Sequence, residues 1–377
     1  MRIEVDKELL LRSLNIADSL IPSRNVNAVL ANCLFNVSKD EIQIAATDNE
    51  IGIKTTLEAI TDGEISFTVN GTRFSGLLKE LPGGIIIIDI SESYQIDVKT
   101  KSSNIKGDFT LIGTSGEDYP EIPDFHDKGA VEINQGELKN MIRKVIYAAA
   151  TDTIKPFFNG IYFVSPSREN LTLVATDSRR LSIITRNIKN EINLDEGIIL
   201  PLKAMHELQR LLSSDGTCCF SMQDNQCFFK IGNTQFVTRT IDHKFPNYKQ
   251  VIPKDQDISV NIPRTKLMES LRRALIFTRP PANTVVCHFK KDLLTLEVKT
   301  SELGECIEDI AATSEIGEET VIGLNAQFLY ESVKEMDSET VNIGITGQMS
   351  PAKFIPDNDP DFISVIMPIK IKSQENE

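Results

Sequence analysis

Amphipathic helical patterns recur in each third of the chain. In each pattern, apolar residues recur at helical spacing after a polar residue or a proline, which is a typical helix start. The first pattern of each third begins at Leu9, Leu138 and Leu267. The second begins near Asn70, Pro201 and Asn325, where Asn is a favoured N-cap and Pro a favoured first helical residue. The sequence therefore predicts three similar repeats with two helices each.

Strand-like segments separate the predicted helices. Apolar and polar residues alternate in corresponding segments of the three repeats, as in residues 42–44, 171–173 and 294–296. Gly, Asp and Asn bound many of these segments, which is typical of antiparallel strands joined by short turns. We expect an α+β fold of three repeated domains, each with two helices packed on antiparallel sheets.

Two proline-containing segments predict the domain boundaries. A chain of 377 residues is too long for one hydrophobic core. Tyr119-Pro120 and Phe245-Pro246 are aromatic-proline pairs in corresponding places, and proline favours extended backbone before it. We therefore predict domains at residues 1–125, 126–253 and 254–377.

The N-terminal segment, the apolar runs and the cysteines of the chain favour a cytoplasmic protein. Acidic residues near the N-terminus do not suit a signal peptide, and the apolar run at residues 85–88 stops at Asp89, too short for a membrane span. The six cysteines have no CxxC spacing. We expect a cytoplasmic protein without membrane contact, whose thiols are reduced and mostly buried.

Charge is distributed unevenly along the chain. The formal net charge is −14, which by itself argues against nucleic acid as a partner. The six predicted helices nevertheless carry a net positive charge together, so the strands and loops carry the acidic excess. If the helices share one side, that side attracts phosphate. The alternative is that Lys and Arg are simply good exposed helix formers.

No catalytic signature is present, and we expect neither a cofactor nor a metal. The sequence lacks a phosphate-binding loop, HExxH and GxSxG, and its four histidines are scattered. Two Ala-Thr-Asp segments at corresponding places offer Asp48 and Asp177 as ligands or bases of a metal-assisted hydrolase. We favour a structural role, in which each Thr-Asp pair caps the turn after a strand.

The second Ala-Thr-Asp segment carries a family resemblance. The run from Leu173 to Leu181, LVATDSRRL, resembles the ATDGHRLA signature of bacterial DNA polymerase III beta subunits, the sliding clamps. Phe158-Asn159-Gly160, the linker Phe245-Pro246-Asn247-Tyr248 and the final VIMPIK run agree with the same family. The resemblance covers the full length of the chain.

The resemblance implies a fold and a function. Family members have three similar domains and dimerise head to tail into a ring whose helices line the hole. Such a ring holds the replicative polymerase on duplex DNA by topological linkage, without catalysis and without reading sequence. The implied partners are double-stranded DNA, the polymerase catalytic subunit, a clamp loader, other proteins with a clamp-binding motif and a second copy of the chain.

The resemblance also implies DNA-facing cations. Arg24 and Lys203 correspond to DNA-facing positions of the family, and the charges of the predicted helices add further candidates. The full set is Arg24, Arg73, Lys79, Arg143, Lys144, Lys203, Arg272 and Arg273.

A partner-peptide groove between the second and third domains is a further implication. It would take a short peptide with Gln, Leu and Phe side chains. The matched positions are Phe158, Thr176, Ser178, Arg179, Arg180, Leu181, Pro246, Val251, Asn325, Phe328, Met349, Pro351, Val365, Ile366, Met367, Pro368 and Ile369. The final run is also explained by a buried C-terminal strand.

Three departures from the family pattern affect the implied sites. Ser178-Arg179 replaces the commoner Gly-His pair, which adds a cation at the groove. Pro281 or Ala282 falls where the family has a bulky residue, and Lys155-Pro156-Phe157 replaces a pair of tyrosines. Peptide preference is therefore open.

Two other functions remain as alternatives to the clamp. One is the metal-assisted hydrolase with Asp48 and Asp177. The other is an adaptor that binds peptides but does not encircle DNA.

Overall fold

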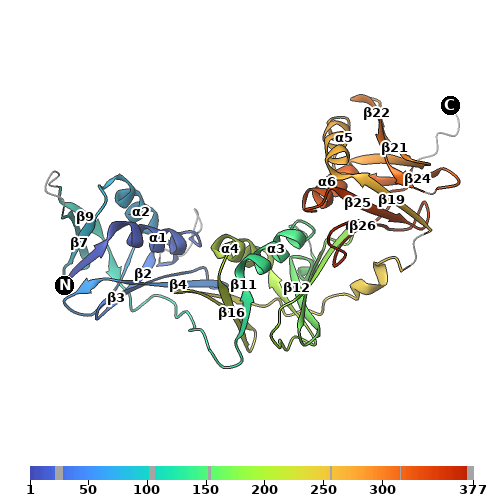
Figure 1. Cartoon of the computed structure of the whole chain (residues 1–377). Helices are drawn as coiled ribbons and strands as arrows, with labels where there is room; N and C mark the ends of the chain where they lie inside the picture. Colours follow the sequence, from blue (N-terminus) through green and yellow to red (C-terminus); the bar gives the residue numbers. More distant parts are fainter. Residues whose placement is uncertain (22–28, 102–106, 152–153, 255–256, 315, 372–377) are drawn as a thin grey trace. The chain divides into compact units, whose positions relative to one another are not determined.

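The computed structural model describes residues 1–21, 29–101, 107–151, 154–254, 257–314 and 316–371 (Figure 1). Contacts divide the chain into two compact units. The first unit comprises residues 1–136 and 206–240, and the second comprises residues 137–205 and 241–377. The central third of the chain therefore contributes to both units.

Two antiparallel sheets build the first unit. A five-stranded sheet has the order β5-β1-β7-β8-β9, and a nine-stranded sheet has the order β10-β6-β2-β3-β4-β18-β17-β16-β11. The strands of the smaller sheet are β5 (Ile60–Thr61), β1 (Arg2–Asp6), β7 (Ile85–Ile90), β8 (Gln95–Thr100) and β9 (Phe109–Ile112). Those of the larger are β10 (Thr114–Ser115), β6 (Ile65–Val69), β2 (Cys33–Ser38), β3 (Glu41–Thr47), β4 (Ile51–Glu58), β18 (Thr234–Arg239), β17 (Gln226–Ile231), β16 (Thr217–Gln223) and β11 (Val131–Asn134).

The second unit repeats this plan. Its nine-stranded sheet has the order β15-β12-β13-β14-β27-β26-β25-β19-β23, and its four-stranded sheet has the order β22-β21-β20-β24. The strands of the larger sheet are β15 (Ile198–Pro201), β12 (Gly160–Ser167), β13 (Asn170–Thr176), β14 (Arg180–Asn187), β27 (Phe362–Ile366), β26 (Ala352–Pro356), β25 (Thr340–Ile345), β19 (Ile258–Pro263) and β23 (Thr313–Ser314). Those of the smaller are β22 (Gly304–Ala311), β21 (Leu293–Thr300), β20 (Thr284–Lys290) and β24 (Thr320–Asn325).

The predicted helices are present in all three thirds. They are α1 (Lys7–Asp18), α2 (Gly71–Glu80), α3 (Gln135–Ile146), α4 (Leu202–Leu211), α5 (Arg264–Ile276) and α6 (Ala326–Lys334). Three short 3-10 helices are η1 (Val29–Ala31), η2 (Pro156–Phe158) and η3 (Tyr248–Val251). Asn70 and Asn325 cap α2 and α6 as predicted, since their side chains accept from the amides of Arg73 and Phe328. Pro201 is not the first helical residue: it ends β15, and α4 begins at Leu202.

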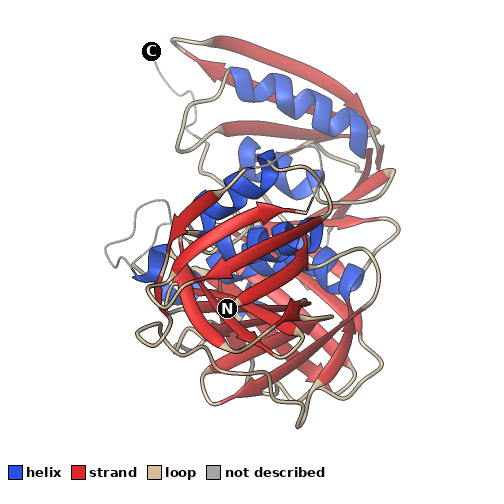
Figure 2. Ribbon diagram, turned by 90° about the vertical axis from the view of Figure 1, so that its left-hand side faces the viewer, coloured by secondary structure: helices blue, strands red, loops and turns tan. Residues whose placement is uncertain are grey.

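Each first helix of a third buries its apolar face. Leu10, Leu14 and Ala17 of α1 are fully buried, and α1 packs on β3 and β4. The corresponding residues Leu267, Leu271 and Ala274 bury α5 against β21 and β22. Figure 2 shows the helices lying against the sheets. Burial of the periodic apolar positions is thus what fixes these helices.

Strand pairing joins neighbouring thirds within each unit. In the first junction, β4 pairs with β18, with Ile51 opposite Thr238 and Thr55 opposite Thr234. In the second junction, β14 pairs with β27, with Arg180 opposite Ile366 and Ile184 opposite Phe362. Edge strands that would otherwise expose unpaired backbone groups are covered in this way. The predicted boundaries near Phe125 and Pro253 lie in segments outside helices and strands.

The cysteines are free thiols, as predicted. Cys33, Cys218, Cys227 and Cys287 are buried, and Cys219 and Cys306 are partly exposed. Burial raises the pKa of Cys218, Cys227 and Cys287 to about 12, so these thiols stay protonated at neutral pH.

Among the described residues, no helix is both long enough and apolar enough to cross a membrane.

Candidate partner groove and basic helix surfaces

The Ala-Thr-Asp segment of the second unit forms a capped turn between β13 and β14. The Asp177 carboxylate accepts from the amides of Arg179 (2.9 Å) and Arg180 (3.0 Å). The Thr176 hydroxyl donates to the Arg180 carbonyl at 2.6 Å and accepts from the Ser178 amide at 3.1 Å. Ser178 has a φ of 75°, a left-handed conformation in which the glycine of the family signature is favoured. The structural role that we predicted for Thr176 and Asp177 is confirmed.

The equivalent turn of the first unit has the same bonds. Asp48 accepts from the amides of Glu50 (2.9 Å) and Ile51 (2.7 Å), and the Thr47 hydroxyl donates to the Ile51 carbonyl at 2.7 Å. The hydrolase hypothesis needs the carboxylates of Asp48 and Asp177 as ligands or bases, but both carboxylates already accept hydrogen bonds from the backbone of their turns. In the described part of the chain, no group of three or more His, Cys, Asp or Glu side chains is placed to hold a metal ion.

Arg180 connects the second turn to α6. Its guanidinium pairs with Asp177 (3.0 Å) and with Glu331 of α6. The same guanidinium lies over the ring of Phe328, 4.3 Å from the centroid, and over Tyr147 at 5.4 Å. Arg180 is a predicted groove residue, and here it fixes the position of the Phe328 ring.

The segment that follows β27 forms one wall of the candidate groove. After β27, the Met367 amide donates to the Arg179 carbonyl at 2.8 Å, and the Ile369 amide donates to the Gly323 carbonyl at 2.7 Å. A Cβ at Gly323 would lie 2.6 Å from the Ile369 carbonyl oxygen, so only glycine permits this close approach. The segment 367–369 is thereby held between the second turn and β24.

These elements enclose a pocket of about 400 Å³ in the second unit. Asn325, Pro281 and Ala282 form another part of the wall, where the Asn325 side-chain amide donates to the carbonyls of Pro281 (3.3 Å) and Ala282 (2.8 Å). Most of the lining is apolar, and Arg179 is the charged residue in it. The lining consists of Arg179, Pro281, Ala282, Asn325, Phe328, Met367, Pro368 and Ile369.

The pocket contains six of the seventeen predicted groove residues, and the others lie elsewhere in the second unit. Phe158, Thr176, Leu181, Val365 and Ile366 are buried. Leu181 and Val365 belong to an apolar cluster with Phe245, against which Tyr248 and Ile252 pack. Ser178, Pro246, Val251 and Met349 are exposed, and Pro351 is half-buried. Pro281 and Ala282 were not in the predicted set, although the sequence marked them as a departure from the family pattern.

The predicted basic residues differ in how their charges are used. Arg73, Lys79, Lys203, Arg272 and Arg273 are exposed on their helices. Arg272 donates to the Tyr330 hydroxyl at 3.0 Å, and Arg273 makes two bonds of 2.6 Å to Glu308. Arg24 lies outside the described residues.

Lys144 corrects the prediction for α3. Its side chain is buried and pairs with Asp359 at 2.7 Å, so it does not offer its charge to an external phosphate. Arg143 is partly buried and pairs with Glu335 at 2.7 Å and with Asp337. No local sequence pattern predicts these pairs, since their partners are far away along the chain. Glu331 of α6 and Glu335 at its C-cap pair with Arg180 and Arg143.

The second junction is filled by charged and polar side chains. Asp359 accepts from both Lys144 and Arg186, and Arg186 also pairs with Glu137 at 2.9 Å. Burial by itself raises the pKa of Asp359, but the bonds from Arg186 and Lys144 outweigh it and lower that pKa below its usual value. Burial raises the pKa of the Tyr147 hydroxyl, which contacts Ser332 and Ser364.

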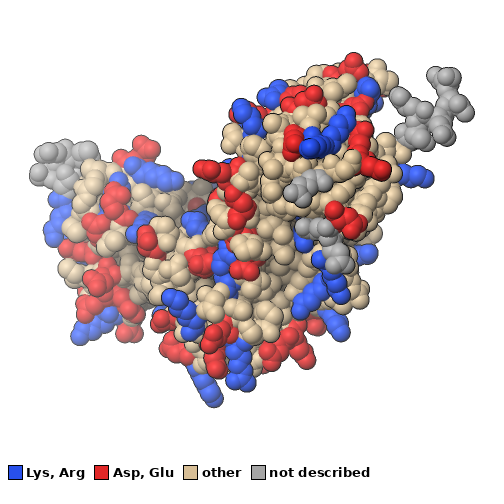
Figure 3. Space-filling view, turned by 45° about the vertical axis from the view of Figure 1, so that its right-hand side comes forward, with Lys and Arg blue, Asp and Glu red and all other residues tan. Residues whose placement is uncertain are grey.

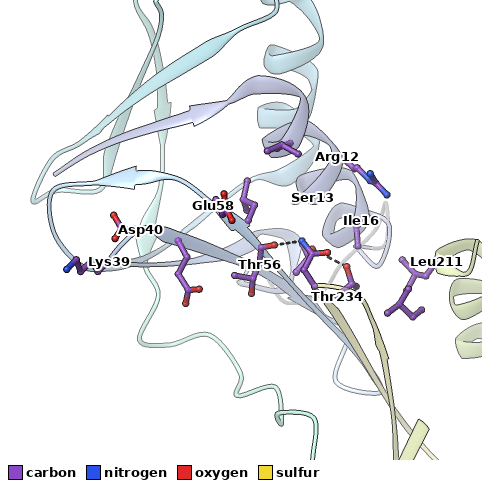
Figure 4. A pocket seen from close by; sticks show the side chains of 15 residues that line it. Arg12, Ser13, Ile16, Lys39, Asp40, Thr56, Glu58, Leu211 and Thr234 are labelled. Carbon is purple, nitrogen blue, oxygen red and sulfur yellow. Dashed lines mark hydrogen bonds between the residues drawn. The ribbon is translucent and has the colours of Figure 1, made fainter. Parts of the chain in front are cut away.

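The first junction has a cavity beside its paired strands. A cavity of about 620 Å³ lies between α1, the β4–β18 pair and Leu211. Small polar side chains line its inner part, with the Thr234 and Thr55 hydroxyls 3.1 Å apart (Figure 4). Arg12 and Glu58 lie at its exposed rim.

Charges of both signs are interspersed on the face shown in Figure 3. This face is therefore not uniformly basic, and any attraction for a polyanion on it depends on individual positions.

Three family models match consecutive parts of the chain. The N-terminal, central and C-terminal domains of the DNA polymerase III beta subunit match residues 1–123, 132–247 and 249–370. A beta sliding clamp from Staphylococcus epidermidis is 25% identical over 380 residues, which span 98% of this chain and 99% of the relative.

Solved structures agree in fold. The DNA polymerase III beta subunit of Thermotoga maritima has a TM-score of 0.89 at 27% identity, over 98% of this chain and 99% of the other. The DNA polymerase sliding clamp of Bacillus subtilis has a TM-score of 0.92 at 22% identity, with the same coverage of both chains. At that identity the second likeness speaks for the fold alone.

Proposed function

Because the chain belongs to the DNA polymerase III beta subunit family, it is a non-catalytic sliding clamp, and we propose that two copies close head to tail into a ring around duplex DNA. The observation that carries this proposal is the succession of three matched domains over nearly the whole chain, each third with its two helices. The domain boundaries at residues 125 and 253 and the cytoplasmic location remain predictions.

Two free sheet edges support the dimer. β9 and β22 each end a sheet, and each pairs with a neighbour on one side among the described strands. Ile112 of β9 is 76% exposed and Ile307 of β22 is 56% exposed. Apolar side chains on an unpaired strand edge invite a further strand. We propose that β9 of one copy pairs with β22 of the second.

A matched pair of variants tests this contact. Ile112→Asp places a charge on the proposed edge and is expected to shift the mass in solution to that of a monomer. Ile60 is 70% exposed on β5 at the opposite edge of the same sheet, so Ile60→Asp is expected to leave the dimer intact. A dimer that persists in Ile112→Asp would show that another surface closes the ring.

DNA attraction is proposed to come from exposed helix cations. Arg73, Lys79, Lys203 and Arg272 are exposed candidates, with Arg272 bonded to the Tyr330 hydroxyl; Arg273 joins them although it pairs with Glu308. Contacts of Lys and Arg with phosphates carry no sequence information, and they weaken as salt rises because counterions are released from DNA. Arg24 remains a candidate, whereas Lys144 is excluded by its burial.

The pocket beside Arg179 is proposed to bind partner proteins. An apolar pocket with a few polar groups suits a short segment with large apolar side chains. We propose that the replicative polymerase, a clamp loader and other proteins with a clamp-binding motif use this pocket, so that they compete for it.

Retention on DNA is the decisive test of encirclement. After loading, the dimer is expected to persist on circular DNA and to leave DNA that has been linearised. Equal loss from both forms would mean ordinary electrostatic binding, and peptide binding without retention on circles would favour the adaptor function. The hydrolase function has no support, because Asp48 and Asp177 act as caps.

A further inference from the structure

The Arg179 guanidinium lies beside an apolar pocket and has no acidic partner among the described residues. Its backbone is fixed, since its amide donates to Asp177 (2.9 Å) and its carbonyl accepts from Met367 (2.8 Å). Its side chain is exposed, lines the pocket and makes no ion pair with the described residues. Arg179 therefore presents its charge from a rigid base.

The two carboxylates that pair with the neighbouring Arg180 are already engaged. Asp177 bonds two backbone amides and Arg180. Glu331 pairs with Arg180 through one oxygen and accepts from Gln327 at 2.6 Å through the other. Neither acid is left to neutralise Arg179, so among the described residues no carboxylate competes with a partner segment for its guanidinium.

The pocket limits what can bring that partner. At about 400 Å³ it lies at the small end of the range of roughly 300–1,000 Å³ for ligand pockets, and its walls are mostly apolar. A pocket of this volume has room for one or two large apolar side chains of an extended segment. A guanidinium at its edge binds a carboxylate through two parallel hydrogen bonds, a geometry that an amide reproduces poorly.

We propose that Arg179 makes this groove selective for partner segments that carry a carboxylate next to their apolar side chains. This inference rests on the proposed binding of partners at the pocket, and it adds the chemical class that the pocket prefers. The carboxylate is that of an Asp or Glu side chain within the partner segment.

Labelled peptides that differ at one position test the proposal. All three peptides carry Gln, Leu and Phe. The first two have an amidated C-terminus and carry Asp or Asn beside the Leu. The third carries Asn and ends in a free carboxylate directly after the Phe. Affinities are measured by fluorescence anisotropy for the full chain, for Arg179→Gln and for Lys370→Gln. Lys370 is an exposed cation one residue beyond the pocket lining, so its variant controls for net charge.

The full chain is expected to bind the Asp peptide about twofold to fivefold more tightly than the Asn peptide, as a partly exposed charged pair predicts. Arg179→Gln is expected to abolish this preference, and Lys370→Gln to retain it. Tighter binding of the third peptide than of the Asp peptide would overturn the proposal, because a chain end rather than an acidic side chain would then be the preferred partner of Arg179. An unchanged unfolding transition shows that Arg179→Gln is folded.

The measurements distinguish failure of the proposed role of Arg179 from failure of the proposed partner groove. Equal affinity for the Asp and Asn peptides in the full chain overturns the role of Arg179 and leaves the groove in place. A preference that persists in Arg179→Gln also overturns it, because another cation must then read the acid. If no peptide binds, the partner groove itself is wrong and the selectivity falls with it.

Discussion

The two junctions share a backbone plan and differ in what lies above it. In each, an Ala-Thr-Asp turn with the same hydrogen bonds leads into the strand that pairs with the neighbouring third. Above the first junction lies a cavity of about 620 Å³, lined by apolar, threonine and charged side chains. Above the second, Lys144, Arg186 and Asp359 form ion pairs. The repeated backbone therefore fixes the turn and the pairing, and the side chains decide which interactions lie above each junction.

The largest expected difference follows from breaking the charged cluster of the second junction. The Lys144 side chain is 4% exposed, so Asp359→Asn leaves a buried cation without its main partner. The loss of a partner from a buried pair costs about 3 kcal/mol. We expect the free energy of unfolding, measured by urea denaturation, to fall by that amount. Asp337→Asn is the control, because Asp337 is 58% exposed and its contact with Lys144 is 3.7 Å, which predicts a loss of less than about 1 kcal/mol.

The same cluster predicts an acid sensitivity. The pKa of Asp359 is lower in the folded protein than its ordinary value of 3.8, so its contribution to stability is complete above that pH. The contribution is lost as the pH falls through the folded pKa. Asp359→Asn removes this source of acid sensitivity, so the difference between the two proteins is expected to shrink from pH 7 to pH 3. A constant difference would mean that Asp359 does not titrate as an ion pair.

Matched substitutions in the two turns separate stability from binding. Thr176→Val and Thr47→Val each remove a hydroxyl that donates to a carbonyl and accepts from an amide. Each is expected to cost about 1–2 kcal/mol in unfolding experiments. Only Thr176→Val, which loosens the turn that carries Arg179, is expected to weaken peptide binding severalfold. Equal effects on binding would mean that the second turn does not position the pocket.

The smallest expected effect concerns the left-handed residues of the two turns. Ser178 has a φ of 75° and Asn49 has a φ of 74°. Asn tolerates this conformation better than Ser does, and Gly adopts it without strain. We expect Ser178→Gly to raise the free energy of unfolding by about 0.5 kcal/mol and Asn49→Gly to leave it nearly unchanged. A loss of stability in Ser178→Gly would show that the serine side chain compensates for the strain.

The sequence by itself determined the helices, the two Asn caps and the two capped turns, although it misplaced the start of α4 at Pro201. Those features depend on residues close together in the chain: the apolar period of α1, the Asn70 and Asn325 caps, and the contact of Asp177 with the amides that follow it. The sequence also identified the pocket residues Arg179 and Met367 through the family pattern.

Only the tertiary structure decided which charges are free. Lys144 and Arg179 are both cations in predicted sites, yet one is buried against Asp359 and the other is exposed without an ion-pair partner among the described residues. Lys144 and Asp359 meet because β14 pairs with β27, which brings distant segments together. Local patterns do not encode such pairing, since register and packing are set by the whole sheet. The helices could therefore be predicted from the sequence, whereas the use of their charges depends on the fold.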